Sequence, residues 1–335
     1  MGLMGCCLVL VMVTASLVAW TPEATAADKV YRWRMQTLQA LKMEGAYDQL
    51  FENLNVATDG RVQIQWFPSG AIVPSDQMAQ AVSKGTLECA FTYGGYHSGY
   101  IDIANLECGV PMAWSSVEGA MKFHYVFGFE NLAREAYAEK GIYWVTPIME
   151  EPFLLISKTP VRSIEDMKKL KVRCTSTVAT VLKPFGISTI YLPSEEFYTS
   201  LATGVIDAII YGSEASYTAL KLQEVAKYIT NIKILNPMTS AFIVNQKVWD
   251  SLPPDLQVIV RELARANFNI DHYRVRTQMA NEVKDVFEYQ PFPAEDVARL
   301  TEAAQEVWEK EAAKSPRAAK GVEMLKKLAR EEGRL

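Results

Sequence analysis

The chain has 335 residues, of which 49% are hydrophobic and 22% are charged, as expected for an ordinary globular protein of about two domains. Its formal net charge of −5 leaves no basic field to attract nucleic acid or anionic lipid, so both kinds of partner are excluded.

The first 26 residues have the pattern of a secretory signal peptide. An apolar run over residues 8–20 precedes Ala24-Thr25-Ala26, a small-x-small cleavage site. The run is too short for a membrane-spanning helix, which needs about 20 apolar residues. We therefore expect residues 1–26 to be removed on secretion. Three cysteines then remain, so at most one disulfide can form; they are Cys89, Cys108 and Cys174.

Alternating and helical apolar patterns follow each other along the first half of the chain. Strands are predicted over 30–35, 62–66 and 87–93, and helices over the stripe 47–54 and over 75–83. The first strand is followed by Gln36 and Thr37, in a loop that leads to the first helix.

A loop rich in tyrosine and glycine ends the third strand. It reads YGGYHSGY from Tyr93 to Tyr100. Such a loop can present hydroxyls and ring faces to a ligand, which favours Tyr93 and Tyr96 as binding residues, or its tyrosines can fill a surface groove. His97 has no acid or nucleophile at a telling spacing, so we interpret it as an incidental loop residue.

Helices over 116–127 and 130–139 and a strand over 143–148 lead to the adjacent acids Glu150 and Glu151. Such a pair can be a catalytic or metal-binding site, or two solvated acids that point in different directions. The apolar segment that begins at Phe153 is expected to cross into a second domain.

The stretch from residue 170 to 211 predicts an α/β unit. A strand carrying Arg173 is followed by two helices, the second ending at Gly204, and by an apolar strand that ends at Tyr211. Ligands bind at the carboxyl ends of such strands. A guanidinium there matches a carboxylate in bidentate fashion, although a surface arginine or an internal salt bridge would have the same sequence.

The remaining chain is mainly helical. We expect a helix over 217–228, a strand over 239–245 and helices over 294–314 and 317–332. Residues 255–290 contain neither glycine nor proline and would form a helix about 50 Å long if unbroken.

No catalytic motif is present. The sequence lacks GxSxG, HExxH, a P-loop and a dinucleotide fingerprint, which favours a binding protein over an enzyme. The alternative is an unrecognised enzyme that uses Glu150 and Glu214 as an acid pair.

The sequence LKVR at residues 170–173, followed by a helix and then by Pro193 and SEEFYTSLATGVIDA, resembles the DctP-type solute-binding proteins of tripartite ATP-independent periplasmic (TRAP) transporters. RVQIQWFPSG and the long glycine-free helix are also similar to that family. The residues that fall on the family pattern are Arg173, Pro193, Glu196, Tyr198, Leu201, Gly204 and Asp207.

The resemblance implies an α/β, two-lobed periplasmic solute-binding fold with a long domain-spanning helix. It places lobe 1 at 27–152, completed by about 240–335, and lobe 2 at 153–239. It also implies a periplasmic protein that closes around a small organic acid, held by a salt bridge to Arg173, and that works with the small and large permease subunits. A periplasmic sensor for a receptor kinase is an alternative.

Two departures from the family pattern point to the ligand. Tyr211 stands where many members have an asparagine, and Phe153 where many have a second arginine. We therefore expect a monocarboxylate with an apolar or aromatic body, with a C4-dicarboxylate as the alternative. The residues expected to bind substrate are Arg173, Tyr211, Tyr93, Tyr96, Phe153, Gln36, Thr37, Glu214 and Glu150.

The YGGY segment and the tail over 294–335 resemble the branch that binds 2-oxo and 2-hydroxy acids, and the tail implies a homodimer. In that branch a cation bridges protein and substrate, held partly by a glutamate at the position of Ile210. Isoleucine cannot coordinate a metal, so we expect no cofactor unless Glu150 or Glu214 replaces that glutamate.

Overall fold

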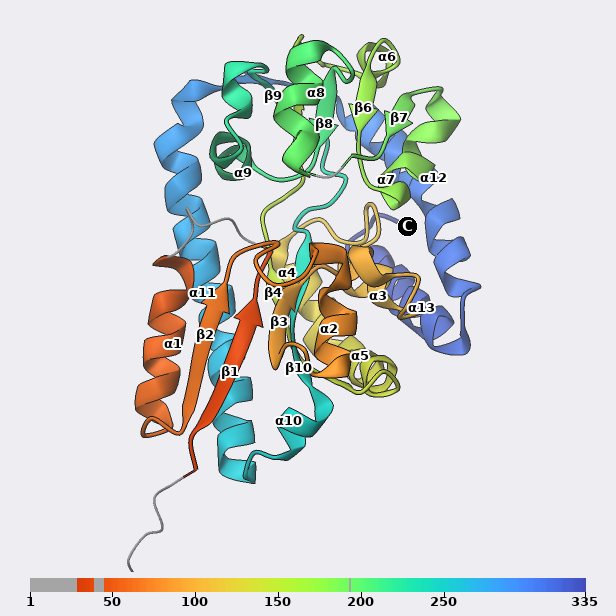
Figure 1. Cartoon of the computed structure of the whole chain (residues 1–335). Helices are drawn as coiled ribbons and strands as arrows, with labels where there is room; N and C mark the ends of the chain where they lie inside the picture. Colours follow the sequence, from red (N-terminus) through yellow and green to blue (C-terminus); the bar gives the residue numbers. More distant parts are fainter. Residues whose placement is uncertain (1–28, 39–44, 193) are drawn as a thin grey trace, which may run out of the picture.

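A computed structural model describes residues 29–38, 45–192 and 194–335; the predicted signal peptide lies outside these ranges. Two sheets, each covered by helices, form two bodies joined by crossing segments (Figure 1). We call the body around the five-stranded sheet lobe 1 and the body around the six-stranded sheet lobe 2. The architecture is the expected mixed α/β fold.

The sheet of lobe 1 has the strand order β2-β1-β3-β10-β4. β1 runs parallel to β2 and β3, and β10 runs antiparallel to β3 and β4. Every residue of β3 and β10 is buried, as expected for central strands covered on both faces. The bounds are β1 Tyr31–Gln36, β2 Val62–Phe67, β3 Cys89–Thr92, β4 Ile142–Met149 and β10 Thr239–Asn245.

Short helices cover the sheet of lobe 1. The apolar stripe predicted on α1 is correct, because Tyr47, Leu50 and Leu54 pack into the core beside β1 and β3. The helices are α1 Gly45–Ala57, α2 Met78–Lys84, α3 Ala104–Glu107, α4 Val117–Met121, α5 Phe129–Ala138 and α10 Gln246–Asp250, with a π-helical turn over Lys122–Val126.

The sheet of lobe 2 has the order β11-β9-β5-β8-β6-β7. β6 runs parallel to β8, so Arg173 and Ile209 are register partners near the carboxyl ends of both strands. The strands are β5 Leu155–Ser157, β6 Lys171–Arg173, β7 Ser188–Ile190, β8 Ala208–Ile210, β9 Tyr228–Thr230 and β11 Glu288–Gln290. The helices are α6 Ile164–Met167, α7 Ser176–Leu182, α8 Phe197–Thr203 and α9 Glu214–Ala219.

Long helices tie the lobes together. The 30-residue helix α11 (Pro254–Val283) contacts α1 and β4 of lobe 1 and α9 of lobe 2 (Figure 1). On the other side, α12 (Ala294–Ala312) packs on α7 and on α13 (Pro316–Glu331), which packs on α3 and α5. Within the described ranges, no helix has the length and hydropathy needed to cross a membrane.

Two expectations for secondary structure were wrong in detail. The helix predicted over 217–228 is only α9, followed by a short 3-10 turn and by β9. The long helix ends at Val283 rather than near Gln290, and strand β11 follows it. β11 falls in the stretch expected to complete lobe 1, yet it pairs with β9 in the sheet of lobe 2. The edge strand β7 was not predicted.

Candidate functional site

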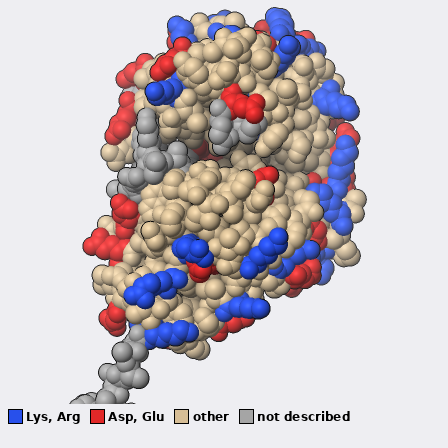
Figure 2. Space-filling view, viewed as in Figure 1, with Lys and Arg blue, Asp and Glu red and all other residues tan. Residues whose placement is uncertain are grey.

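A cavity of about 360 Å³ lies between the lobes, where the surface shows a furrow (Figure 2). Its walls come from the β2–α2 loop and the tyrosine loop of lobe 1, from the segments that cross between the lobes, and from the strand ends of lobe 2. The lining residues are Leu38, Ser69, Gly70, Pro74, Ser75, Asp76, Tyr93, Tyr96, Glu150, Glu151, Phe153, Arg173, Thr175, Tyr191, Ser194, Tyr211, Gly212, Ser216 and Met238.

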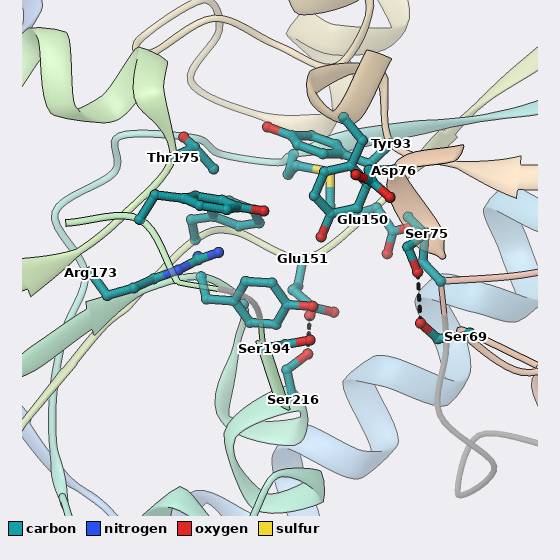
Figure 3. Close-up of a pocket in the computed structure, with 18 of the residues that line it drawn as sticks. Ser69, Ser75, Asp76, Tyr93, Glu150, Glu151, Arg173, Thr175, Ser194 and Ser216 are labelled. Carbon is teal, nitrogen blue, oxygen red and sulfur yellow. Dashed lines mark hydrogen bonds between the residues drawn. The ribbon is translucent and has the colours of Figure 1, made fainter. Parts of the chain in front are cut away.

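Arg173 reaches this cavity from the carboxyl end of β6 (Figure 3). The residue is only 2% exposed. Its Nε donates to the carbonyl of Leu192 at 3.0 Å, and Nη1 lies 3.5 Å from the carbonyl of Ile210. Among the ion pairs between described side chains, none involves Arg173. Because arginine stays charged, this guanidinium places a buried positive charge at the cavity wall.

Aromatic rings surround the guanidinium and hold it in place. The carbon Cζ of Arg173 lies 4.4 Å from the ring centre of Phe197, 5.3 Å from that of Tyr191 and 5.4 Å from that of Tyr211. Each ring face attracts the cation while leaving the in-plane donors available. The three rings therefore restrict where the guanidinium can lie at the cavity wall.

The aromatic lining continues from lobe 2 into lobe 1. Tyr211 lies 5.9 Å from Phe153, Phe153 lies 6.5 Å from Tyr93, and Tyr93 packs edge-on against Tyr96 at 5.3 Å, all between ring centres. Four of the predicted binding residues thus form one row along the cavity. Burial raises the pKa of the Tyr93 hydroxyl well above its ordinary value, so it acts as a neutral hydrogen-bonding group.

Glu150 and Glu151 lie where the chain crosses between the lobes. The N–H of Glu150 donates to the carbonyl of Met238, and the N–H of Met238 donates to the carbonyl of Glu151. These bonds pair the two crossing segments. The Oε1 of Glu151 accepts from the hydroxyl of Ser216 at 2.5 Å, and Glu150 is 3% exposed.

Three residues expected to bind substrate are not in the cavity lining. Gln36 is buried, and its amide bonds the backbone of Ile72 and Val73, which fixes the β2–α2 loop. Thr37 is also fully buried, and its N–H donates to Phe67. Glu214 accepts a hydrogen bond from the hydroxyl of Tyr289 at 2.7 Å instead.

His97 is not an incidental loop residue. It is 2% exposed, and its Nε2 lies 2.8 Å from the hydroxyl of Tyr137, which in turn donates to Glu107. Because that hydroxyl donates to Glu107, His97 must donate to it from Nε2. Burial raises the pKa of Glu107 to about 8 and lowers that of His97 to about 3, so both groups are neutral near pH 7.

The described residues offer no ready-made metal cage and no disulfide. No three described His, Cys, Asp or Glu side chains gather so as to hold a metal ion, although Asp76, Glu150 and Glu151 all line the cavity. Cys89, Cys108 and Cys174 are free and buried, so the one disulfide that their number allowed does not form. Burial raises the pKa of Cys174, next to Arg173, to about 12.

Sequence reasoning missed the part of the lining that comes from the connection between β2 and α2 of lobe 1. Ser69, Gly70, Ser75 and Asp76 lie between β2 and α2, the first two in a turn and the last two in a 3-10 helix over Ser75–Gln77. A signal was available, because small and polar residues follow the carboxyl end of a parallel strand, where α/β proteins bind ligands.

The chain belongs to the bacterial extracellular solute-binding protein family 7, DctP, which matches residues 36–315. This result confirms the family predicted from the residues around Arg173: the chain is a solute-binding protein of the TRAP type.

Characterised relatives and a solved structure are similar over most of the chain. The monocarboxylate 2-oxoacid-binding periplasmic protein of Nostoc sp. is 26% identical over 74% of this chain and 70% of its own. The ectoine/5-hydroxyectoine-binding periplasmic protein of Ruegeria pomeroyi is 26% identical over 90% and 88%. A TRAP solute-binding protein of Chromohalobacter salexigens, solved with (S)-2-amino-1-propanol, matches with a TM-score of 0.80 and 23% identity over 90% of this chain and 96% of its own, which supports the fold.

Proposed function

We propose that the protein captures a small organic acid with one carboxylate, bound directly by Arg173, and delivers it to the membrane subunits of a TRAP transporter. The proposal depends mainly on the buried guanidinium, which faces a cavity between two lobes and forms no ion pair with any described side chain. A buried cation is costly without an anion, so a ligand carboxylate is its natural partner.

The aromatic row supports an acid with an apolar or aromatic body. Tyr93, Tyr96, Phe153 and Tyr211 offer ring faces along the cavity, and burial of apolar ligand surface contributes about 25 cal/mol per Å². A C4-dicarboxylate fits less well, because a second carboxylate on the ligand would lie in a cavity that already contains the acids Asp76, Glu150 and Glu151.

The mechanism is closure of the two lobes on the ligand. Arg173 belongs to lobe 2, while Tyr93, Tyr96 and Ser75 belong to lobe 1, so a ligand bound in the cavity can contact both sets at once. Such differential contacts are what stabilise a closed state. We also propose that residues 1–26 direct export and that the protein is periplasmic. It would bind its ligand without a bridging cation and would form a homodimer.

The test is a binding screen of monocarboxylates, dicarboxylates and neutral analogues by thermal shift and calorimetry. The Arg173→Gln variant should bind the best acid about 100-fold more weakly or worse, because one partner of a buried charge pair is removed. Arg32→Gln, an exposed substitution near the start of β1, is the matched control and should bind like the unmodified protein. Near-native affinity in Arg173→Gln would overturn the proposal.

A further inference from the structure

The peptide group between Ile210 and Tyr211 lies at the end of β8, where Tyr211 lines the cavity. Its carbonyl oxygen lies 3.5 Å from Nη1 of Arg173, and its N–H donates to the hydroxyl of Tyr217 at 3.2 Å. The peptide bond is trans, so its C=O and N–H point in opposite directions. Arg173 and Tyr217 therefore contact the same peptide group from opposite sides.

The hydroxyl of Tyr217 lies between the ends of β5 and β8. It donates to the carbonyl of Leu154 and accepts from the N–H of Tyr211. The direct distance from that N–H nitrogen to the Leu154 carbonyl is 3.4 Å, longer than an ordinary N–H···O bond. Without the hydroxyl, the N–H of Tyr211 can move toward the Leu154 carbonyl. The carbonyl of Ile210 would then turn away from Arg173, because both groups belong to one rigid plane.

We infer that Tyr217 is a positioning residue for the proposed ligand-binding arginine, and that it acts by fixing the peptide group between Ile210 and Tyr211. Two of the contacts of Arg173 depend on this peptide, because the Tyr211 ring, 5.4 Å from Cζ, belongs to it as well as the Ile210 carbonyl. The inference rests on the proposed function and adds a residue to the same site. Tyr217 does not line the cavity, so its effect on a ligand would be indirect.

Tyr217 is itself firmly held. It is fully buried in the core of lobe 2, and its N–H donates to the carbonyl of Ser213, the N-cap of α9, at 3.0 Å. The hydroxyl of the neighbouring Ser216 donates to Glu151 at 2.5 Å (Figure 3). Burial raises the pKa of the Tyr217 hydroxyl, which keeps its proton and donates it to Leu154. Such a support suits a long guanidinium side chain, because bidentate pairing with a carboxylate requires a defined geometry.

Tyr217→Phe removes the hydroxyl and keeps the ring in the core. The matched control is Tyr137→Phe, in which a fully buried tyrosine of lobe 1 also loses a hydroxyl with two partners. Both variants should lose stability, but only Tyr217→Phe should bind the acid more weakly, by about tenfold. Tyr137→Phe should stay within about threefold. Calorimetry well below the unfolding transition keeps both variants folded, so a loss of stability alone does not change the affinity. The probes are butyrate, benzoate and cyclohexanecarboxylate, of which the one that the unmodified protein binds most tightly is used.

The nuclear magnetic resonance signal of the Arg173 Nε–H group gives a readout that a purely structural role would not change. It is recorded on isotope-labelled protein without ligand and assigned by its absence in Arg173→Gln. Because Nε donates to the carbonyl of Leu192, its signal reports movement of the guanidinium. Tyr217→Phe should shift this signal, and Tyr137→Phe should leave it in place. An unshifted signal in Tyr217→Phe, or equal losses of affinity in the two tyrosine variants, would overturn the inference.

The variants also separate this inference from the proposed function. If Arg173→Gln loses binding while Tyr217→Phe keeps its affinity within about threefold, only the inference fails. If Arg173→Gln binds the chosen acid normally, the proposed function fails. The resonance measurement needs no ligand, so it tests the placement of Arg173 by Tyr217 even when none of the three acids binds.

Discussion

Two buried polar sites of this molecule behave in opposite ways. In lobe 1, Glu107, Tyr137 and His97 form a chain of hydrogen bonds in which each group has a partner from the protein. In lobe 2, Arg173 is equally buried, and the described residues place two carbonyls and three rings around it and no carboxylate in an ion pair with it. The lobe 1 cluster of Glu107, Tyr137 and His97 is neutral, whereas the arginine keeps its charge.

The difference teaches how to distinguish a structural group from a binding group. Burial removes the charge from Glu107 and His97, because a carboxyl or an imidazole can adopt its neutral form. Arginine cannot do so at any physiological pH. A buried arginine that forms no ion pair with a described side chain therefore favours the proposed ligand site, whereas a buried, internally bonded glutamate favours a structural role.

Glu107, Tyr137 and His97 support the loop that carries Tyr93 and Tyr96. A Cβ on Gly94 would lie 3.0 Å from Oε2 of Glu107, so the carboxyl lies directly beneath the turn that follows Tyr93. His97, at the end of the same turn, bonds Tyr137. The lobe 1 cluster thus fixes the turn that carries Tyr93 and Tyr96, without lining the cavity itself.

The largest expected effect comes from Arg173→Met, which separates binding from stability. Affinity for the best acid should fall about 100-fold or more if the guanidinium binds the ligand carboxylate as proposed. The free energy of unfolding without ligand should change by no more than about 1 kcal/mol, since the loss of ring and carbonyl contacts is offset by removing a desolvated charge. Calorimetry and urea unfolding measure the two quantities. A large loss of stability would show that the arginine is structural.

The pH dependence of stability tests the neutral state of Glu107. The pKa of this carboxyl is about 8 in the folded protein, against a usual 4.5, so folding retains a proton that unfolding releases between these values. The contribution is complete below pH 4.5 and is lost as the pH rises toward 8, by at most about 1.4 kcal/mol per pH unit. Glu107→Gln should flatten this slope in urea unfolding at pH 5 to 8.

The acidic side of the same profile is an internal control. His97 and His124 have pKa values lowered by burial to about 3, so the unfolded chain binds protons there before the folded one does. Stability should fall as the pH drops from 6.5 toward 3, and Glu107→Gln should leave this limb in place. An unchanged slope above pH 5 in that variant would contradict the assignment.

Tyr137→Phe should reduce stability without reducing affinity directly. The substitution removes one hydroxyl and leaves Glu107 and His97 buried without their shared partner, at a cost of about 2 kcal/mol. Affinity for an acid should stay within about threefold, because Arg173 is untouched. Tyr31→Phe, whose hydroxyl bonds a carbonyl at an exposed site, is the matched control and should cost less. Equal losses of stability in the two variants would mean that the buried hydrogen bonds of Tyr137 stabilise the fold no more than an exposed one does.

The lobe 2 side of this contrast could be predicted from the sequence, because it depends on local patterns. Arg173 and Tyr211 follow from strand ends, and Gly204 follows from a helix end, where its φ is +77°. Asp207 fell on the family pattern, and its carboxylate accepts from the N–H of Lys171, which joins the two strands that carry Arg173 and Tyr211.

The parts that could not be predicted depend on distant segments. Glu107 and Tyr137 are 30 residues apart, and no periodic pattern shows that they meet. Strand β11 has only three residues and directly follows a helical stretch without glycine or proline, so nothing in its own sequence marks the change. Gln36 lies in the expected place, but its amide bonds the backbone of residues 72 and 73 rather than the cavity.

Phe197→Leu should cause the smallest loss of affinity, and it tests the ring contact that holds the guanidinium. Phe197 is fully buried and provides the nearest ring to Arg173, so leucine removes a cation–π contact of about 1 kcal/mol while it keeps an apolar core residue. Affinity for an acid should fall about fivefold, because the arginine remains but is held less well. Phe91→Leu, a fully buried ring in lobe 1, is the matched control for the loss of packing. If both variants lose affinity equally, the Phe197 ring affects binding only through the stability of the fold. The rings around Arg173 would then not be needed to hold the guanidinium for an anion.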